Sequence, residues 1–350
     1  MMAKPIPVGG PYFEDFSLGQ VIDDAPTMTL TSGLAALHQA ISGDRLRLAL
    51  DHDLSAATTG DDRPLAHPML VINLAIGQTT WFSQRVRGNL FYRGLVHVKP
   101  VFIGDSLRTR STVVGLRQNK ARPGRDATGM VALEIEVSRQ AGDTVLHFWR
   151  CPMIPCRDTK AETGHADSFD DIPDTLAIDA VAKAVPATWR LDHFKAQCPG
   201  PHFAELETGT VYAIEARDRI TSAPEMARAT LNMAMTHYDG TQGAYGEQLV
   251  FGGHTISLAA AQASRALPNL VTILAWNGCD HTGPVFEGDM LSTELAIEGL
   301  HPLAGETSGP GLVELRARVA AERGQSAVRA GFEPACLDDV LDWRFIALMA

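Results

Sequence analysis

A nine-residue phrase occurs twice in this chain, 184 positions apart. Residues 97–105 read HVKPVFIGD, and residues 281–289 read HTGPVFEGD. A second pair of segments, FEDFSLG at 13–19 and FAELETG at 203–209, aligns at a shift of 190. The two shifts differ by only six positions (190 − 184), which is an ordinary loop insertion. The chain is therefore predicted to contain two copies of one domain, and positions where the copies differ are the places to look for chemistry.

The overall composition fits two soluble domains. At 350 residues, with 45% hydrophobic and 20% charged residues, the chain has the length and apolar content for two ordinary domains with real cores. Its formal net charge of −11 disfavours nucleic acid as a partner, because neutralising phosphates requires a basic face. An anionic small ligand remains compatible, since it needs only a local cluster of donors.

Cysteine usage and hydropathy indicate a cytoplasmic protein. The five cysteines are an odd number without CxxC spacing, so neither a disulfide framework nor a thiolate zinc site is expected. The N-terminus lacks the apolar core of a signal peptide. The most apolar stretch, residues 69–76, is interrupted by Asn73 and is too short to span a bilayer.

The domain boundaries follow from the repeat. The N-terminal copy is predicted at 10–157 and the C-terminal copy at 187–350. Residues 158–186 are rich in Asp, Thr and Ala, with little periodic apolar pattern, and are interpreted as a linker.

Each copy has the same predicted order of elements: a Phe-rich turn, a short strand, two helices and a run of strands. The predicted helices are 32–42, 68–86, 223–235 and 253–265. The predicted strands are 88–98, 106–118, 129–139, 144–153, 272–281, 290–298, 311–321 and 327–332. The second helix of each copy is apolar on all sides, as expected for a helix wrapped by other structure. The fold is therefore predicted to be α+β, a double hotdog in which each copy curls an antiparallel sheet around a central helix.

Several of these phrases resemble the MaoC-like family of hotdog dehydratases, also called (R)-specific enoyl-CoA hydratases. The opening YFEDFSLG at 12–19 and the Pro-Val-Phe-x-Gly-Asp entry to a strand are both typical of that family. Within the family, LVFGGH at 249–254 and CDH at 279–281 resemble mesaconyl-CoA hydratase, also called beta-methylmalyl-CoA dehydratase. The resemblance covers nearly the whole chain and occurs in both copies.

The resemblance implies where the catalytic residues lie in copy two. The family's active-site phrase reads Asp-x-Asn-Pro-x-His-x-Asp, with its first Asp and its His as the catalytic pair. The matching stretch, NMAMTHYD at 232–239, has His237 and Asp239 at the expected spacing. Asn232 stands where the catalytic Asp is expected, so the usual two-base mechanism is in doubt.

Copy one has lost the equivalent histidine. Its matching stretch keeps Asp44 and Asp51 but has Ala49 at the histidine position. Alanine cannot transfer a proton, so the N-terminal hotdog is predicted to be catalytically degenerate and the active site to lie in copy two.

Hydration of an enoyl thioester requires a base for water, an acid for Cα and donors for the enolate-like oxygen. His237 is assigned as the general base, because the pKa of imidazole lies near neutral pH. Asn232 would hold the water through its amide but cannot take its proton. Asp239 either fixes the tautomer of His237 or serves as a loop cap.

A glycine-rich turn precedes the central helix of copy two. Gly252 and Gly253 let backbone amides approach a ligand, and a helix N-terminus favours negative charge, so Gly253 is the expected oxyanion donor. Glycines placed only for close packing are the alternative. Copy one has Pro68 and Met69 at these positions, and proline removes one donor. His254 is expected to contact an acidic substrate group, assist proton transfer or cap the helix.

Two features shared by both copies are interpreted as structural. His97 and His281 occupy equivalent positions, and retention in the degenerate copy favours a structural role. The Gly-Asp pairs at 104–105 and 288–289 are expected to form tight turns that lead into strands.

The predicted function is reversible hydration of an enoyl-CoA, with mesaconyl-CoA and beta-methylmalyl-CoA as the expected substrate and product. Coenzyme A is expected only as part of the substrate, with no metal or redox cofactor. The predicted partner is an acyl-CoA, without nucleic acid or membrane, and a homodimer is possible. The alternatives are a hotdog acyl-CoA thioesterase and a non-catalytic acyl-CoA binding protein.

Overall fold

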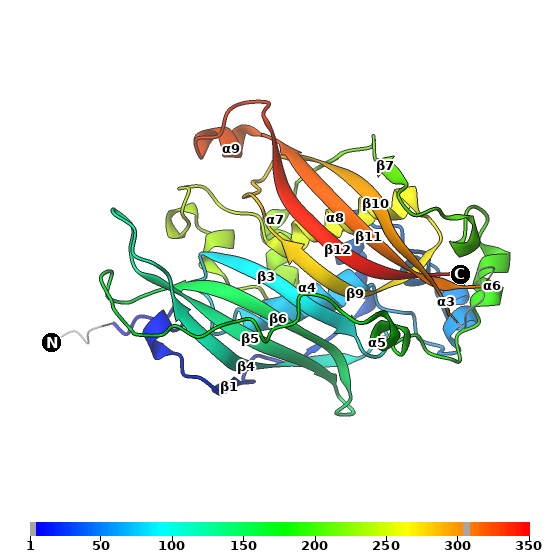
Figure 1. The fold of residues 1–350 in the computed structure, drawn as a ribbon, viewed down its shortest axis with the longest axis horizontal. Coiled ribbons are helices and arrows are strands. Elements are labelled where there is room, and N and C mark those ends of the chain that lie inside the picture. Colours follow the sequence, from blue (N-terminus) through cyan, green and yellow to red (C-terminus); the bar gives the residue numbers. More distant parts are fainter. Residues whose placement is uncertain (1–4, 304–308) are drawn as a thin grey trace.

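Both copies contribute to one continuous antiparallel sheet. The structure is a computed structural model that describes residues 5–303 and 309–350. In Figure 1 the strands of copy one, in cyan and green, lie below those of copy two, in yellow to red, and the central helices lie behind them. Each copy is thus a curled sheet around a helix, as the sequence predicts.

Copy one begins with short elements and ends with four long strands. Its helical segments are η1 (Phe13–Asp15), α1 (Ser32–Ser42), α2 (Arg47–Leu50), α3 (His52–Thr59) and α4 (Pro68–Thr79). Its strands are β1 (Val21–Ile22), β2 (Met28–Thr29), β3 (Gly88–His97), β4 (Ser106–Gln118), β5 (Thr128–Arg139) and β6 (Thr144–Pro155).

Copy two repeats this order after two connecting helices, α5 (Ile178–Ala182) and α6 (Leu191–Gln197). Its helical segments are η2 (Phe203–Glu205), α7 (Ala223–Ala229), η3 (Met235–His237), η4 (Gly240–Gln242), α8 (Gly252–Ala266) and α9 (Gln325–Arg329). Its strands are β7 (Val211–Ala213), β8 (Asp218–Arg219), β9 (Leu270–Asp280), β10 (Met290–Pro302), β11 (Gly311–Glu322) and β12 (Leu337–Met349).

The two copies meet through strands β3 and β9. The strand order is β1-β4-β5-β6-β3-β9-β12-β11-β10-β7, with β2 beside β4 and β8 beside β10. The β3–β9 pairing is antiparallel and sets Tyr92 opposite Cys279 and Leu95 opposite Trp276. The sheet therefore runs from one copy into the other without a break.

The central helices α4 and α8 also meet at this junction. Every residue of α4 is buried, and α8 is buried from Gly253 to Ser264. The Asn73 amide nitrogen donates to Ser257 Oγ at 2.9 Å, and that hydroxyl donates to the Gly253 carbonyl at 2.7 Å. The helices apolar on all sides are thus buried as predicted, and one polar contact joins them across the copies.

The repeated Gly-Asp pairs form the expected turns. Gly104 and Gly288 have φ values of 101° and 93°, the left-handed region that favours glycine. Asp105 accepts from the Phe102 N–H at 3.0 Å, and Asp289 accepts from the Phe286 N–H at 3.1 Å.

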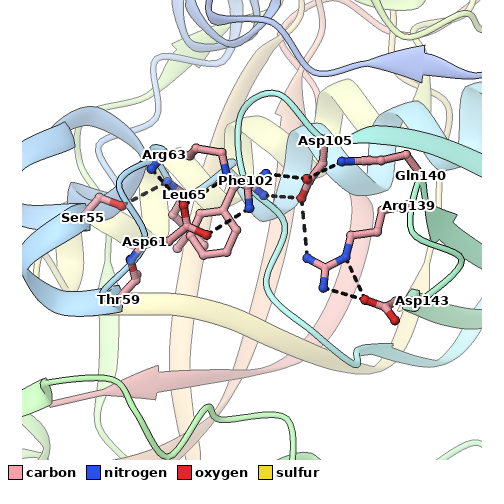
Figure 2. A network of polar contacts seen from close by, with 10 residues as sticks. All are labelled: Ser55, Thr59, Asp61, Arg63, Leu65, Phe102, Asp105, Arg139, Gln140 and Asp143. Atoms are coloured by element: carbon pink, nitrogen blue, oxygen red, sulfur yellow. Dashed lines mark hydrogen bonds and ion pairs between the residues drawn. The ribbon is translucent and has the colours of Figure 1, made fainter.

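Each of these aspartates also anchors a polar network. Figure 2 shows Asp105 bound by Arg63 and Gln140, with Arg139 near it. Asp289 is instead paired with Arg323 at 3.0 Å, and the side chains of this pair are 0% and 1% exposed. Both aspartates therefore stabilise the turns that lead into β4 and β10, as the sequence predicts.

Three predicted elements differ from the structure. Helix α4 ends at Thr79, and α7 ends at Ala229, two residues before Leu231 adopts a positive φ of 59°. The predicted strand at 327–332 is wrong, because α9 occupies this region. The place beside β11 is taken by the later and more apolar β12, which buries Trp343 and Phe345.

The segment between the copies packs against both of them: Val181 is buried in a cluster that includes Leu65 of copy one and Val271 of copy two. Phe169 and Ile172, within the predicted linker, are buried in a cluster with Phe91 and Cys151. The boundaries at 10–157, 158–186 and 187–350 stay predictions. All five cysteines are free. Over residues 5–303 and 309–350, the helices are too short or too polar for any of them to cross a membrane.

The two Gly-Asp turns offer a matched test of buried charge. Asp289→Ala removes the buried partner of the Arg323 guanidinium and leaves it only the partly exposed Asp338, which should cost about 3 kcal/mol in the free energy of unfolding. Asp105→Ala should cost less, because the Arg63 side chain is 41% exposed and can turn to water. Urea unfolding of both variants tests this, and equal losses would contradict it.

Candidate active site

A cavity of about 300 Å³ lies where the two copies meet. Copy two lines it with Asn232, His237 and the start of α8, and with the loop after β9. Copy one contributes residues from the end of α4, from β3, and Arg150 from β6. The cavity is therefore shared, although the predicted catalytic residues all come from copy two.

His237 is held through Nδ1, and its Nε2 has no hydrogen-bond partner within residues 5–303 and 309–350. It ends η3, and its Nδ1 lies 3.0 Å from the Leu249 carbonyl oxygen. A carbonyl can only accept, so Nδ1 carries the proton and Nε2 has a free lone pair. Burial lowers the pKa of His237 to about 4. The ring is therefore neutral near pH 7 and able to accept a proton at Nε2.

Asn232 lines the same cavity. Its side chain is buried, and its Oδ1 accepts from the Ala234 N–H at 3.0 Å. The Tyr238 hydroxyl donates to the Asn232 backbone carbonyl and fixes the residue further. With Oδ1 used by the backbone, the amide nitrogen is the atom left to donate to a ligand or water.

Asp239 does not orient His237. Its Oδ1 accepts from the Thr241 N–H at 3.0 Å and from the Thr241 hydroxyl at 2.7 Å. The side chain is exposed and caps η4, so its pKa is lowered by these hydrogen bonds. The loop-cap interpretation therefore describes its position, and the Leu249 carbonyl fixes the tautomer of His237 instead.

The N-terminus of α8 faces this cavity without a side-chain cap. Its N-cap residue is Phe251, which has no acceptor, and Gly252 lines the cavity. Both glycines are also tightly packed. A Cβ on Gly252 would lie 2.4 Å from His281 Nε2, and one on Gly253 would lie 2.2 Å from Asn73 Oδ1. Packing alone explains why these residues are glycine, and the oxyanion role stays a prediction.

His254 lies away from the other candidate residues. It is completely buried on α8, neither ring nitrogen has a hydrogen-bond partner within the described part of the chain, and it is not among the cavity-lining residues. Burial lowers its pKa to about 4. The structure therefore groups His237, Asn232 and Gly252 in the cavity and leaves His254 in the interior between the copies.

The sequence interpretation missed two cavity residues. His281, expected to be structural, lines the cavity, and its Nε2 has no partner among the described residues. Arg150 also lines it, although it comes from copy one. The available signal for Arg150 was an arginine within the apolar strand segment 148–151. Burial of a charge there is unfavourable unless a partner compensates for it.

The corresponding region of copy one has a different cap. Asp44 accepts from the Leu46 N–H as Asn232 does from Ala234, so the local backbone geometry is repeated. His67 Nε2 lies 2.9 Å from Asp44 Oδ1, while its Nδ1 accepts from the Met69 N–H at 3.1 Å. The helix donor equivalent to Gly253 is thus occupied by a side chain in copy one.

No group of three or more His, Cys, Asp or Glu side chains is arranged to hold a metal ion within residues 5–303 and 309–350. The polar side chains that line the cavity are instead two imidazoles, two amides, two guanidiniums and several hydroxyls.

Five histidines should make stability depend on pH. Burial lowers the pKa of His38 and His97 to about 3 and that of His237, His254 and His281 to about 4, from a usual 6.5. The unfolded chain therefore binds more protons between pH 6.5 and about 4, so the free energy of unfolding should fall as pH drops through this window. Each histidine contributes up to about 1.4 kcal/mol per pH unit.

Urea unfolding at pH 7, 6 and 5 measures this effect. A free energy of unfolding that stays constant from pH 7 to 5 would contradict it. His97→Gln, which removes one of the five groups, should make the dependence less steep.

Comparison with known proteins gives consistent matches. The family model described as mesaconyl-CoA hydratase matches residues 7–267. The beta-methylmalyl-CoA dehydratase of Chloroflexus aurantiacus is 30% identical over all of this chain and 99% of its own length.

Two solved structures are similar over nearly the whole chain. The conserved hypothetical protein RV0216 of Mycobacterium tuberculosis, described as a double hotdog, is 48% identical, with a TM-score of 0.87 over 99% of this chain and all of that one. A putative MaoC domain protein dehydratase from Chloroflexus aurantiacus is 29% identical, with a TM-score of 0.83 over 97% of each chain. These matches confirm the double hotdog fold and the resemblance to MaoC-like dehydratases.

Proposed function

This chain belongs to the mesaconyl-CoA hydratase family, and we propose on that basis that it reversibly hydrates mesaconyl-CoA to beta-methylmalyl-CoA. Membership makes it a hydro-lyase, as the sequence predicts. Coenzyme A would enter only as part of the substrate, and the reaction below needs no other cofactor. A homodimer stays a prediction, as does a cytoplasmic location.

One observation carries this proposal more than any other. A neutral histidine with a free Nε2, an amide donor and an uncapped helix N-terminus line the same cavity. These are the base, the water-holding group and the oxyanion donor that addition of water to an enoyl thioester requires. Copy one has Ala49 at the histidine position, and His67 occupies the equivalent helix donor.

The proton transfers can be assigned to His237. Asn232 donates through its amide nitrogen to the attacking water, and His237 Nε2 takes a proton from that water. The water oxygen bonds to Cβ, while the π electrons move toward the thioester oxygen, where the N–H groups at the start of α8 stabilise the charge. The His237 imidazolium then gives its proton to Cα, so both parts of water reach the product and the ring returns to neutral.

Removing the imidazole tests the assignment of His237. His237→Ala should lower kcat by roughly a hundredfold or more, the usual scale of a lost acid–base group. His237→Gln should lower it similarly, because an amide can still donate to Leu249 but cannot exchange protons. His52→Ala removes an exposed histidine of copy one and should leave the rate unchanged.

The rate is measured from the ultraviolet absorbance of the conjugated thioester of mesaconyl-CoA. Near-normal turnover by a folded His237→Ala protein would refute the assignment. Release of free thiol from a saturated acyl-CoA would indicate the thioesterase instead. Binding without either reaction would indicate the non-catalytic protein.

A methyl group at the helix start tests the oxyanion site. In Gly252→Ala the new Cβ would lie 2.4 Å from His281 Nε2, so the histidine ring or the start of α8 must shift. We expect kcat/KM for mesaconyl-CoA to fall by more than about tenfold, because misplacement of about 1 Å is already costly. Gly278→Ala is the control, since its Cβ would meet nothing within 4 Å. Equal activity of the two variants would contradict an oxyanion site here.

A further inference from the structure

Arg150 is a buried cation that the proposed proton transfers do not use. It lies on β6 of copy one, is 2% exposed, and lines the cavity that contains His237 and Asn232. It also acts electrostatically on His237, lowering the pKa of that ring further. Both side chains border the same cavity of about 300 Å³, so one small ligand can contact both.

The partners of Arg150 within the protein are all neutral. Its Nε donates to Asn89 Oδ1 at 3.3 Å, and an Nη donates to the Thr79 hydroxyl. The ionisable groups that act on it are Tyr92 and Cys151, and burial raises the pKa of each to about 12. Within residues 5–303 and 309–350, no carboxylate forms an ion pair with it.

Arg323, which is also buried, differs from Arg150 because it is paired with carboxylates. Arg323 is 1% exposed at its side chain and contacts both Asp289 and Asp338. An arginine stays charged in proteins, and a buried charge without a counter-ion is strongly unfavourable. Arg150 thus has the environment of a group whose anion arrives from outside.

The sheet register gives the counterpart of Arg150 in copy two. Arg150 pairs with Tyr92 on β3, and the equivalent of Tyr92 on β9 is Trp276. Trp276 pairs with Phe345 on β12. The same position is therefore Phe345 in copy two and Arg150 in copy one. Arg150 lines the cavity that also contains His237.

A buried cation without a counter-ion beside the cavity suits a ligand that carries a carboxylate. We propose that Arg150 binds the distal carboxylate of the substrate and so selects dicarboxylic enoyl-CoA thioesters over monocarboxylic ones. The inference rests on the proposed function for the identity of the site. A planar guanidinium suits this task because it can donate two parallel hydrogen bonds to one carboxylate.

Two other roles compete with this one. Arg150 lies at the C-terminal end of α4, where a cation is favoured by the helix dipole, so it could serve only to anchor that helix. Arg87 also lines the cavity, but it is less buried and donates to the Gln242 carbonyl. Each alternative gives a different result in the experiment below.

Binding of two saturated thioesters tests the proposal. Methylsuccinyl-CoA and 2-methylbutyryl-CoA differ only in a carboxylate against a methyl group, and neither can be hydrated. By isothermal titration calorimetry, the wild-type protein should bind methylsuccinyl-CoA more tightly by on the order of 10- to 100-fold, the scale of a charge-assisted hydrogen-bonded pair. Equal affinities, or a preference for 2-methylbutyryl-CoA, would overturn the proposal without any variant.

Substitutions then locate the preference. Arg150→Met should abolish it by weakening methylsuccinyl-CoA alone, and Arg150→Lys should retain only part of it. Arg110→Met removes an exposed arginine of β4 and should leave the preference intact. Equal weakening of both ligands by Arg150→Met would assign a structural role, and loss of the preference in Arg87→Met alone would assign the carboxylate to Arg87. Either result overturns the proposal.

Kinetics separate this inference from the proposed function. Mesaconyl-CoA and 2-methylcrotonyl-CoA form the matching unsaturated pair. Hydration of both with equal kcat/KM would support a hydratase and refute the role of Arg150. A carboxylate preference in binding that Arg150→Met abolishes, without hydration of either thioester, would support the role of Arg150 and refute the proposed reaction.

Discussion

The antiparallel pairing of β3 with β9 is the interaction on which the rest of the structure depends. It joins two curled sheets into one and brings α4 and α8 together, so that Asn73 reaches Ser257 and packs against Gly253. The cavity lies at this seam and takes its walls from both copies. Neither copy alone would enclose it, and the repeat is therefore a requirement of the site as well as of the fold.

The two copies keep one backbone plan but use its key positions differently. The first residue of each active-site phrase accepts an N–H two residues later, from Leu46 in one copy and Ala234 in the other. At the central helices, His67 of copy one caps its own helix, whereas Phe251 of copy two leaves the helix donors without a side-chain acceptor. Divergence at one position thus leaves α4 with a side-chain cap and α8 without one.

Much of the fold could be predicted from the sequence, because the repeat and the apolar helices are local signals. The last strand was not predicted, since the segment around Val328 forms α9 and the strand that pairs with β11 is β12, a pairing that local sequence pattern does not reveal. In the site, the spacing of Asn232 and His237 was sufficient to place both in one cavity. The partner of the His237 ring was missed because a backbone carbonyl, Leu249, leaves no mark on composition. Arg150 was missed because the register that brings β6 to the cavity is a long-range property.

The exchange of arginine for phenylalanine between Arg150 and Phe345 has a consequence for how such a site can arise. In a dimer of identical single-domain chains, every substitution is made twice, and a cation introduced at one cavity also appears at its symmetry mate. Covalent fusion removes that constraint, since each half can then mutate alone. The half that has Ala49 at the position of His237 is then free to supply a different wall of the shared cavity, and the two halves become unlike parts of one asymmetric site.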